Sequence, residues 1–261
     1  MSAPDLPPVK NRLLYIWMVS VKLLSFFYFS LGTVALVTVF FPLMRLFLRP
    51  RKRFRRYARR FVSFQFRMFL TALKVLRVLE VDVDNREAYR NLSSKIVVAN
   101  HPSLLDVVAL ISLIPNADCI VQGYTSRTIL RGVVKQLYIL NTLDFSELCE
   151  ACEQSLEEGN CIIIFPEGTR TPRSGLMTLK RGAARLSLIS GCGVIPLHIG
   201  GTDKYGLGKR DPLLAFNPTE KYVYRIRMQN EISPVRFAAL PAPQAARRLT
   251  AYIKDQLLHL S

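Results

Sequence analysis

Two short polar segments carry side chains suited to catalysis, and each follows an apolar run. The first, residues 100–106, has the sequence NHPSLLD and comes directly after the β-branched run at 96–99. A carboxylate bonded to one ring nitrogen of a histidine fixes the tautomer and leaves the other nitrogen as a base. His101 and Asp106 are the candidates for such a pair here. Acid–base catalysis of this kind accelerates a reaction by roughly 10²- to 10⁴-fold.

The spacing of this pair requires a particular backbone. In one continuous helix, residues five apart point about 140° away from each other, because each residue turns the helix by about 100°. Pro102 favours the first turn of a helix and an extended conformation for the residue before it. His101 can then lie outside the helix and fold back toward Asp106. The alternative is an ordinary helix start with a histidine on the surface.

The second segment, residues 165–170, has the sequence FPEGTR and begins where the apolar run 161–165 ends. Gly168 allows a close approach of the backbone to a ligand. Arg170 carries a planar fork of donors that suits a phosphate. Glu167 is expected to orient Arg170 or a bound hydroxyl, and Thr169 is expected to donate a hydrogen bond. The alternative is a polar loop with a salt bridge, which the presence of two such segments behind two strands disfavours.

The elements around these segments alternate between strand and helix beyond residue 79. This alternation predicts an α/β fold with a mostly parallel sheet flanked by helices, and the carboxyl ends of such strands bind ligands. Strands are expected at residues 96–99, 120–121, 161–165, 194–199 and 222–228, and helices at 103–113, 126–137, 146–158, 181–189 and 241–258.

An N-terminal anchor precedes this region, so we expect an anchor at 1–79 and a catalytic domain at 80–261. The 22 residues from Leu23 to Met44 carry no charge. As a helix they would extend about 33 Å, close to the roughly 30 Å of a hydrocarbon core. Gly32 and Pro42 interrupt this run, so a re-entrant or surface-lying helix is the alternative to a transmembrane span. No small-residue cleavage site follows, which argues against a signal peptide.

The charge of the chain is concentrated in this anchor. Its first 79 residues have a net charge of +14, whereas residues 80–261 have a net charge of +3. The excess of arginine after the apolar run places the catalytic domain on the cytoplasmic side of the membrane. Residues 54–78 form a basic amphipathic helix, with Arg59 among its wet-side residues, that lies among lipid headgroups or packs on the domain. Since lipid explains this charge, no nucleic-acid partner is expected.

The cysteines and histidines give no separate site. Cys149 and Cys152 fall inside an expected helix, which favours core packing over a redox role. His198 ends an apolar strand and is expected to be structural. With His101 and His259 it completes a set of three distant histidines, so no metal site is expected.

Together the two polar segments resemble the motifs of the glycerophospholipid acyltransferases, in particular the bacterial 1-acylglycerol-3-phosphate acyltransferases. That family has a His-x4-Asp block and a Phe-Pro-Glu-Gly-Thr-Arg block. The resemblance covers about residues 95–200 and includes Lys180, Arg181 and the run at 194–197. It implies that His101 deprotonates an acceptor hydroxyl, that Asp106 orients His101, and that the segment from Glu167 to Arg170 holds the acceptor phosphate.

One departure from the family concerns the phosphate contacts. Residues 137–142, LYILNT, lack an arginine that the family often has there. Part of the phosphate contact would then be missing or come from Arg127, Arg131 or Lys135. Lys180 and Arg181 are further candidates, although a solvated helix start explains them equally well.

The resemblance implies transfer of a fatty acyl group to 1-acylglycerol 3-phosphate, giving phosphatidate, at the inner membrane. The co-substrate would be acyl-CoA or acyl-carrier protein, with no cofactor and with membrane lipid as partner. One alternative keeps this chemistry with glycerol 3-phosphate, an amino-acid lipid or a specialised lipid as acceptor. Another is a non-enzymatic lipid-binding scaffold. The sequence leaves the oligomeric state open.

Overall fold

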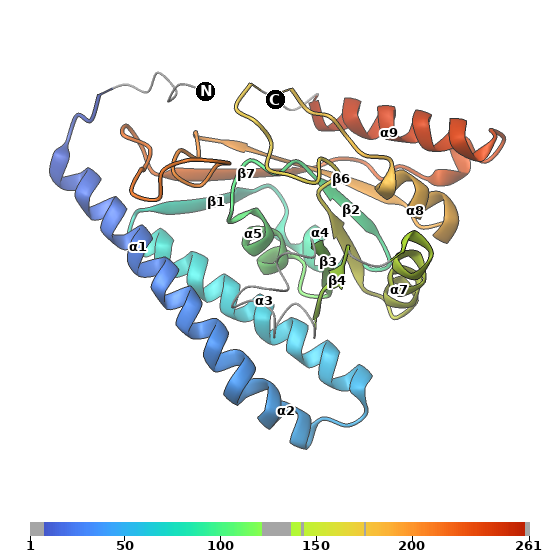
Figure 1. Cartoon of the computed structure of the whole chain (residues 1–261), viewed down its shortest axis with the longest axis horizontal. Coiled ribbons are helices and arrows are strands. Elements are labelled where there is room, and N and C mark those ends of the chain that lie inside the picture. Colours follow the sequence, from blue (N-terminus) through green and yellow to red (C-terminus); the bar gives the residue numbers. More distant parts are fainter. Residues whose placement is uncertain (1–7, 122–136, 142–143, 175, 259–261) are drawn as a thin grey trace.

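A mixed β-sheet forms the middle layer of the molecule (Figure 1). The structure is a computed structural model that describes residues 8–121, 137–141, 144–174 and 176–258. Within these residues seven strands pair in the order β1-β7-β6-β2-β5-β3-β4. Their bounds are β1 (Leu79–Val83), β2 (Ile96–Ala99), β3 (Ala117–Val121), β4 (Ile139–Leu140), β5 (Cys161–Ile164), β6 (Val194–Gly201) and β7 (Tyr222–Met228).

Five neighbouring strands, from β6 to β4, run parallel to one another. Strand β7 is antiparallel to β6, and β1 is parallel to β7, so this edge of the sheet runs in the opposite direction. The prediction of a mostly parallel sheet flanked by helices is therefore confirmed. The sequence did not predict β1, β4 or the reversal at β7.

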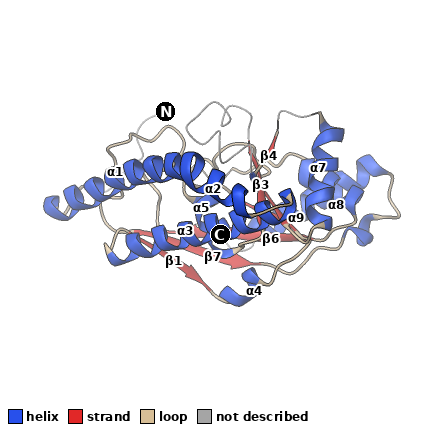
Figure 2. Ribbon diagram, turned by 90° about the horizontal axis from the view of Figure 1, so that it is seen from below, coloured by secondary structure: helices blue, strands red, loops and turns tan. Residues whose placement is uncertain are grey.

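Helices cover both faces of the sheet (Figure 2). In β2, Val97 and Ala99 belong to one hydrophobic cluster, whereas Ile96 and Val98 belong to the other. This alternation is what a strand buried on both faces requires. The described helical segments are α1 (Arg12–Ala35), a π-helical turn (Leu36–Phe40), α2 (Phe41–Phe47), α3 (Arg51–Val75), α4 (Arg86–Arg90), α5 (Asp106–Leu113), α7 (Phe145–Glu157), α8 (Gly182–Ser190), a 3₁₀ turn (Pro234–Phe237) and α9 (Ala242–Leu258).

The expected helices are found where the structure describes the chain, with small shifts at their ends. Helix α7 ends before Gly159, whose φ of 82° is the left-handed conformation expected of a closing glycine. Cys149 and Cys152 are free and buried, and burial raises the pKa of the Cys152 thiol to about 12. A redox role needs a thiolate, so core packing is confirmed for this pair. The expected helix at 126–137 and His259 lie outside the described residues, apart from residue 137.

The apolar N-terminal segment is helical from Arg12 to Phe47, longer than predicted. By length and composition it is able to cross a membrane, with a mean hydropathy of 2.0. The helix continues through Gly32, and the π-helical turn precedes Pro42, which stands in the first turn of α2. It crosses the long helix α3 in Figure 1, and the aromatic pairs Phe29–Phe66 and Phe41–Phe54 join the two.

Helix α3 buries its apolar stripe against the sheet layer, as the second interpretation of this amphipathic helix predicted. Ala58, Val62 and Leu73 are at most 4% exposed. The assignment of Arg59 to the wet side is wrong, because this side chain is only 3% exposed. Its Nε and one terminal nitrogen each donate to a different oxygen of Asp118 at 2.7 Å. A helical pattern cannot reveal such a residue, since its partner lies 59 positions away in β3.

This buried ion pair should be essential to the attachment of α3. Removing one partner of a buried pair leaves an uncompensated charge and costs about 3–5 kcal/mol. Asp118→Ala should therefore lower the unfolding temperature strongly in detergent solution. Glu158→Ala, which removes the exposed bridge to Lys52, should cost no more than about 1 kcal/mol. Equal thermal stability of the two variants would contradict this role of Asp118.

Candidate active site

The two polar segments meet at the carboxyl ends of β2 and β5, which are adjacent in the sheet. Asn100 is the first residue after β2. Its side-chain amide donates to the carbonyl oxygen of Ile199 at 2.9 Å, and its oxygen accepts the backbone N–H of Ile199 at 2.7 Å. These two bonds fix the start of the first segment against β6.

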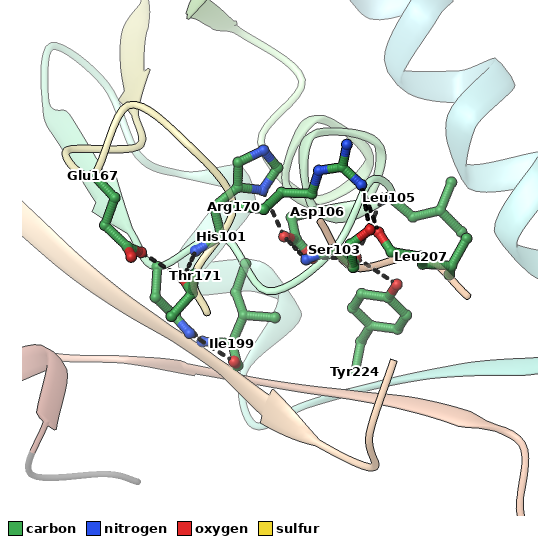
Figure 3. A network of polar contacts seen from close by, with 12 residues as sticks. His101, Ser103, Leu105, Asp106, Glu167, Arg170, Thr171, Ile199, Leu207 and Tyr224 are labelled. Atoms are coloured by element: carbon green, nitrogen blue, oxygen red, sulfur yellow. Dashed lines mark hydrogen bonds and ion pairs between the residues drawn. The ribbon is translucent and has the colours of Figure 1, made fainter. Parts of the chain in front are cut away.

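His101 and Asp106 are brought together as predicted. The Nδ1 atom of His101 lies 2.7 Å from Oδ2 of Asp106 (Figure 3). The expected helix at 103–113 instead begins at Asp106, because residues 103–105 form a turn. This turn places the carboxylate in the first helical turn, pointing back at the imidazole. Asp106 engages Nδ1, which leaves Nε2 as the ring nitrogen available to act as a base.

Ser103 holds the buried carboxylate from the other side. The Asp106 side chain is fully buried, whereas that of His101 is 19% exposed. The backbone N–H of Ser103 donates to Oδ2 of Asp106 at 2.7 Å, and its hydroxyl donates to Oδ1 at 2.6 Å. Both oxygens are therefore hydrogen-bonded, which is the condition for burying a carboxylate without a large penalty.

Thr171 joins the second segment to the first. The backbone N–H of His101 donates to the hydroxyl oxygen of Thr171 at 2.8 Å, and the N–H of Thr171 donates to the carbonyl of His101 at 2.7 Å. The Thr171 hydroxyl in turn donates to the carboxylate of Glu167. Phe165 stacks on the imidazole, with ring centroids 4.2 Å apart. These contacts hold His101 in place, and the sequence analysis did not identify Thr171.

Glu167 thus contacts Thr171 rather than Arg170, which differs from one of the two roles expected for it. Its side chain is nearly buried, at 8% exposed, and burial raises the pKa of its carboxyl group. The hydrogen bond from Thr171 acts in the opposite direction. Glu167 therefore acts on His101 through Thr171.

Arg170 is positioned by a loop far away in the sequence. One terminal nitrogen donates to the carbonyl oxygens of Leu207 at 3.1 Å and Gly208 at 2.7 Å. Figure 3 shows this guanidinium on the same side of the site as the His101 ring. Gly168 has a φ of 67°, and a Cβ atom there would lie 2.8 Å from the ammonium nitrogen of Lys180, so only glycine fits without strain.

The site opens into a cavity of about 900 Å³. His101, Gly168, Thr169 and Arg170 line its polar end together with Lys209. Lys180 and Arg181 are not among the described residues that line it. Its walls come from α1, α3, α5 and β3, and include Phe26, Phe29, Leu36, Val62, Phe66, Phe69, Leu73, Val108, Cys119 and Val121. This is a mainly apolar space whose lining also carries the candidate base His101 and three cations, Arg170, Lys209 and Lys22.

Two other expectations concern residues away from this geometry. Nδ1 of His198 donates a hydrogen bond to the carbonyl oxygen of Leu257 in α9 at 2.8 Å. This contact agrees with a structural role. The alternative phosphate contacts Arg127, Arg131 and Lys135 lie outside the described residues. Lys209 was missed because a single lysine in a loop carries no pattern.

Known proteins with similar sequences were found by comparison with family models and curated sequences. Residues 80–200 match the family model described as Acyltransferase. A chloroplastic 1-acyl-sn-glycerol-3-phosphate acyltransferase of Arabidopsis thaliana is 29% identical over 133 residues, which are 46% of this chain and 36% of that protein. A probable 1-acyl-sn-glycerol-3-phosphate acyltransferase of Mycoplasma genitalium is 23% identical over 172 residues, which are 61% of this chain and 64% of that protein. The chain thus spans less than two thirds of the length of these curated relatives.

The fold has a solved counterpart. The crystal structure of the 1-acyl-sn-glycerophosphate acyltransferase PlsC from Thermotoga maritima superposes with a TM-score of 0.69 at 19% identity. The likeness covers 92% of this chain and 94% of that one. It therefore includes the N-terminal helices as well as the sheet.

Proposed function

Because residues 80–200 match the family model described as Acyltransferase, we propose that this chain transfers a fatty acyl group to the free hydroxyl of 1-acylglycerol 3-phosphate, giving phosphatidate. The acyl donor is a thioester, either acyl-CoA or acyl-carrier protein. The observation that carries this proposal is the His101–Asp106 pair, which opens into the same apolar cavity as Arg170.

The proposed reaction needs one base and no nucleophilic side chain. Nε2 of His101 takes the proton of the acceptor hydroxyl, and the oxygen attacks the carbonyl carbon of the thioester. The tetrahedral intermediate collapses with loss of the thiolate, which receives the proton back from the imidazolium. Asp106 accepts a hydrogen bond from Nδ1–H throughout, so it fixes the tautomer and stabilises the transient imidazolium. The new ester and the free thiol leave the site.

Two cations at the polar end of the cavity support a phosphate-bearing acceptor. One terminal nitrogen of Arg170 donates to the carbonyl oxygens of Leu207 and Gly208, and these bonds fix the plane of the guanidinium group. Its remaining donors suit two phosphate oxygens. In the part of the chain that the structure describes, the ammonium group of Lys209 has no hydrogen bond or ion pair, and this exposed side chain lines the cavity next to Arg170. Lys209 is therefore the second proposed phosphate contact.

The apolar walls support a fatty acyl substrate. The cavity volume lies within the range of roughly 300–1,000 Å³ that is usual for small-molecule sites. Its lining is mainly aromatic and aliphatic, and its polar members besides the end at His101 include Lys22, Ser25, Ser30 and Thr33 of α1. An acyl chain placed along these walls would exclude water from the reacting carbonyl, which protects the thioester from hydrolysis.

An acyl-transfer assay tests this function. Purified protein in lipid micelles would receive labelled acyl-CoA or acyl-carrier protein and a panel of acceptors: 1-acylglycerol 3-phosphate, glycerol 3-phosphate, an amino-acid lipid and monoacylglycerol. We expect phosphatidate from 1-acylglycerol 3-phosphate as the fastest product. A preference for a phosphate-free acceptor would overturn the proposed substrate, and the absence of transfer to every acceptor would overturn the proposed reaction.

We also propose that the N-terminal helices bind the inner membrane and leave the catalytic residues on the cytoplasmic side. Contacts at both ends favour a surface-lying or re-entrant arrangement over a perpendicular span. Lys22 is 4% exposed and donates to the carbonyl oxygens of Ala215 and Gly206, and Phe41 packs on Phe54 in α3. A perpendicular span would carry the arginine-rich start of α3 into hydrocarbon, which is costly.

Cysteine labelling from outside the cell distinguishes the two arrangements. We expect Ser2→Cys and Lys254→Cys both to resist a membrane-impermeant maleimide in intact spheroplasts and to react after lysis. Lys254 lies exposed on α9 and reports the side of the catalytic domain. Labelling of Ser2→Cys alone in intact cells would show a true span.

A further inference from the structure

The carboxylate of Asp106 is buried without a permanent cation beside it. Its only salt-bridge partner among the described residues is His101, which is neutral when it acts as a base. Burying an ionised carboxylate is costly unless charge or hydrogen bonds compensate for it. Three hydrogen bonds from His101 and Ser103 compensate for this burial, and the groups behind Ser103 determine how strongly its hydroxyl donates.

A chain of hydrogen bonds leads from Asp106 to β7. The hydroxyl oxygens of Ser103 and Tyr224 are 2.7 Å apart, and both residues are fully buried (Figure 3). Ser103 gives its only hydroxyl hydrogen to Asp106, so it must accept the hydroxyl hydrogen of Tyr224. The directions are therefore fixed: Tyr224 donates to Ser103, and Ser103 donates to Asp106.

A buried lysine lies at the far end of this chain. Lys204 is 6% exposed, and its ammonium nitrogen lies 4.9 Å from the centre of the Tyr224 ring. It donates to the carbonyl oxygens of Gly200, at 3.2 Å, and Thr202. These partners are neutral, so they do not cancel its charge.

We propose that Lys204 is a positioning residue for acyl transfer, which acts through Tyr224 and Ser103 to keep Asp106 ionised and directed at His101. This inference rests on the proposed function of the site. A cation over an aromatic ring withdraws electron density from it, which makes the phenol a stronger donor. A stronger donor to Ser103 makes the Ser103 hydroxyl a stronger donor to Asp106, since hydrogen bonds in a chain polarise one another.

The charges around Lys204 agree with this role. Burial lowers the pKa of its ammonium group to about 8, while Asp106, Asp203 and Glu220 act in the opposite direction. Tyr224, whose ring lies against the ammonium group, has its pKa raised well above the usual value by burial and stays protonated. With a pKa of about 8, the ammonium group of Lys204 stays mostly charged in the range near pH 6.5 where histidine side chains ordinarily titrate.

Removing the charge should move the titration of His101. Without Lys204 the Ser103 hydroxyl is a weaker donor to Asp106, so the carboxylate keeps more negative charge and stabilises the imidazolium of His101 more strongly. This change raises the pKa of the pair. We expect Lys204→Met to shift the acid limb of kcat/KM by about 0.5 toward higher pH and to lower kcat about tenfold, with little change in KM.

Three variants and two measurements test the inference. Tyr224→Phe interrupts the chain but keeps the ring, and its effect should not add to that of Lys204→Met, because both act on the same path. Lys221→Met, which removes a surface ion pair with Glu80, is the control and should leave the pH profile unchanged. The second measurement is NMR titration of ¹⁵N-labelled histidines, and the chain has only three of them.

The outcomes separate this inference from the proposed function. A higher titration pH for His101 in Lys204→Met supports the inference, even in the absence of measurable turnover. An active wild-type enzyme with an unchanged pH profile and unchanged His101 titration in Lys204→Met overturns the inference alone. Additive losses in the double variant also overturn it, because they would show that Lys204 acts independently of Tyr224. If wild-type protein transfers no acyl group, the proposed function fails while the NMR result still decides the role of Lys204.

Discussion

His101→Ala is expected to lower kcat by roughly 10²- to 10⁴-fold, the range that a positioned general base contributes. The substitution removes the atom that takes the proton of the acceptor hydroxyl. It leaves intact the backbone bonds between residue 101 and Thr171, which do not involve the imidazole. We therefore expect a folded protein with an unfolding temperature close to that of wild type and nearly unchanged substrate binding.

Asp106→Asn should reproduce much of this loss by a different route. An asparagine amide has one accepting oxygen instead of two, so it cannot accept hydrogen bonds from Nδ1–H of His101 and from both donors of Ser103. The imidazole tautomer is then no longer fixed. His198→Ala is the matched control, because His198 bonds to Leu257 and lies outside the cavity. Turnover by His101→Ala within threefold of the control would exclude His101 as the base and would favour a lipid-binding scaffold.

Arg170→Ala is expected to lower kcat/KM for 1-acylglycerol 3-phosphate by about 100-fold. Each hydrogen bond between a charged group and its partner contributes about 1.5–3 kcal/mol, and a factor of ten corresponds to about 1.4 kcal/mol. The loss should appear mainly in KM, because the phosphate is remote from the reacting hydroxyl. Arg170→Lys should not restore activity fully, since a lysine cannot hold the carbonyls of Leu207 and Gly208 and also offer a fork.

A phosphate-free acceptor provides the decisive comparison. With monoacylglycerol, Arg170→Ala should act like wild type, because no phosphate contact is lost. Lys209→Ala should lower kcat/KM for 1-acylglycerol 3-phosphate about tenfold. This effect should weaken at high salt, because Lys209 is exposed. Lys254→Ala, an exposed cation on α9, is the control. If Arg170→Ala lowered kcat/KM equally for 1-acylglycerol 3-phosphate and monoacylglycerol, the role of Arg170 would instead be to support the loop around Leu207.

The sequence alone predicted those features of the site that depend on residues close together in the chain. Each polar segment directly follows a strand, and neighbouring parallel strands end at the same edge of a sheet. The meeting of His101 with the segment at 165–170 could therefore be predicted. The turn at Pro102 made the His101–Asp106 contact predictable as well, although the start of α5 was placed three residues too early. The resemblance to the acyltransferases rested on these same two segments.

Only the tertiary structure decided which distant residues support them. The partner of Arg59 is Asp118, that of Arg170 is the loop at Leu207, and Lys204 reaches the site through β7. Each pairing joins residues many positions apart, and no local periodicity encodes it. The reversal of β7 against β6 is a further example, since it depends on where the chain returns after residue 201. Local sequence thus determined the identity and order of the reacting groups. Long-range packing determined their charges, their burial and their supports, because these depend on neighbours that only the folded chain brings into contact.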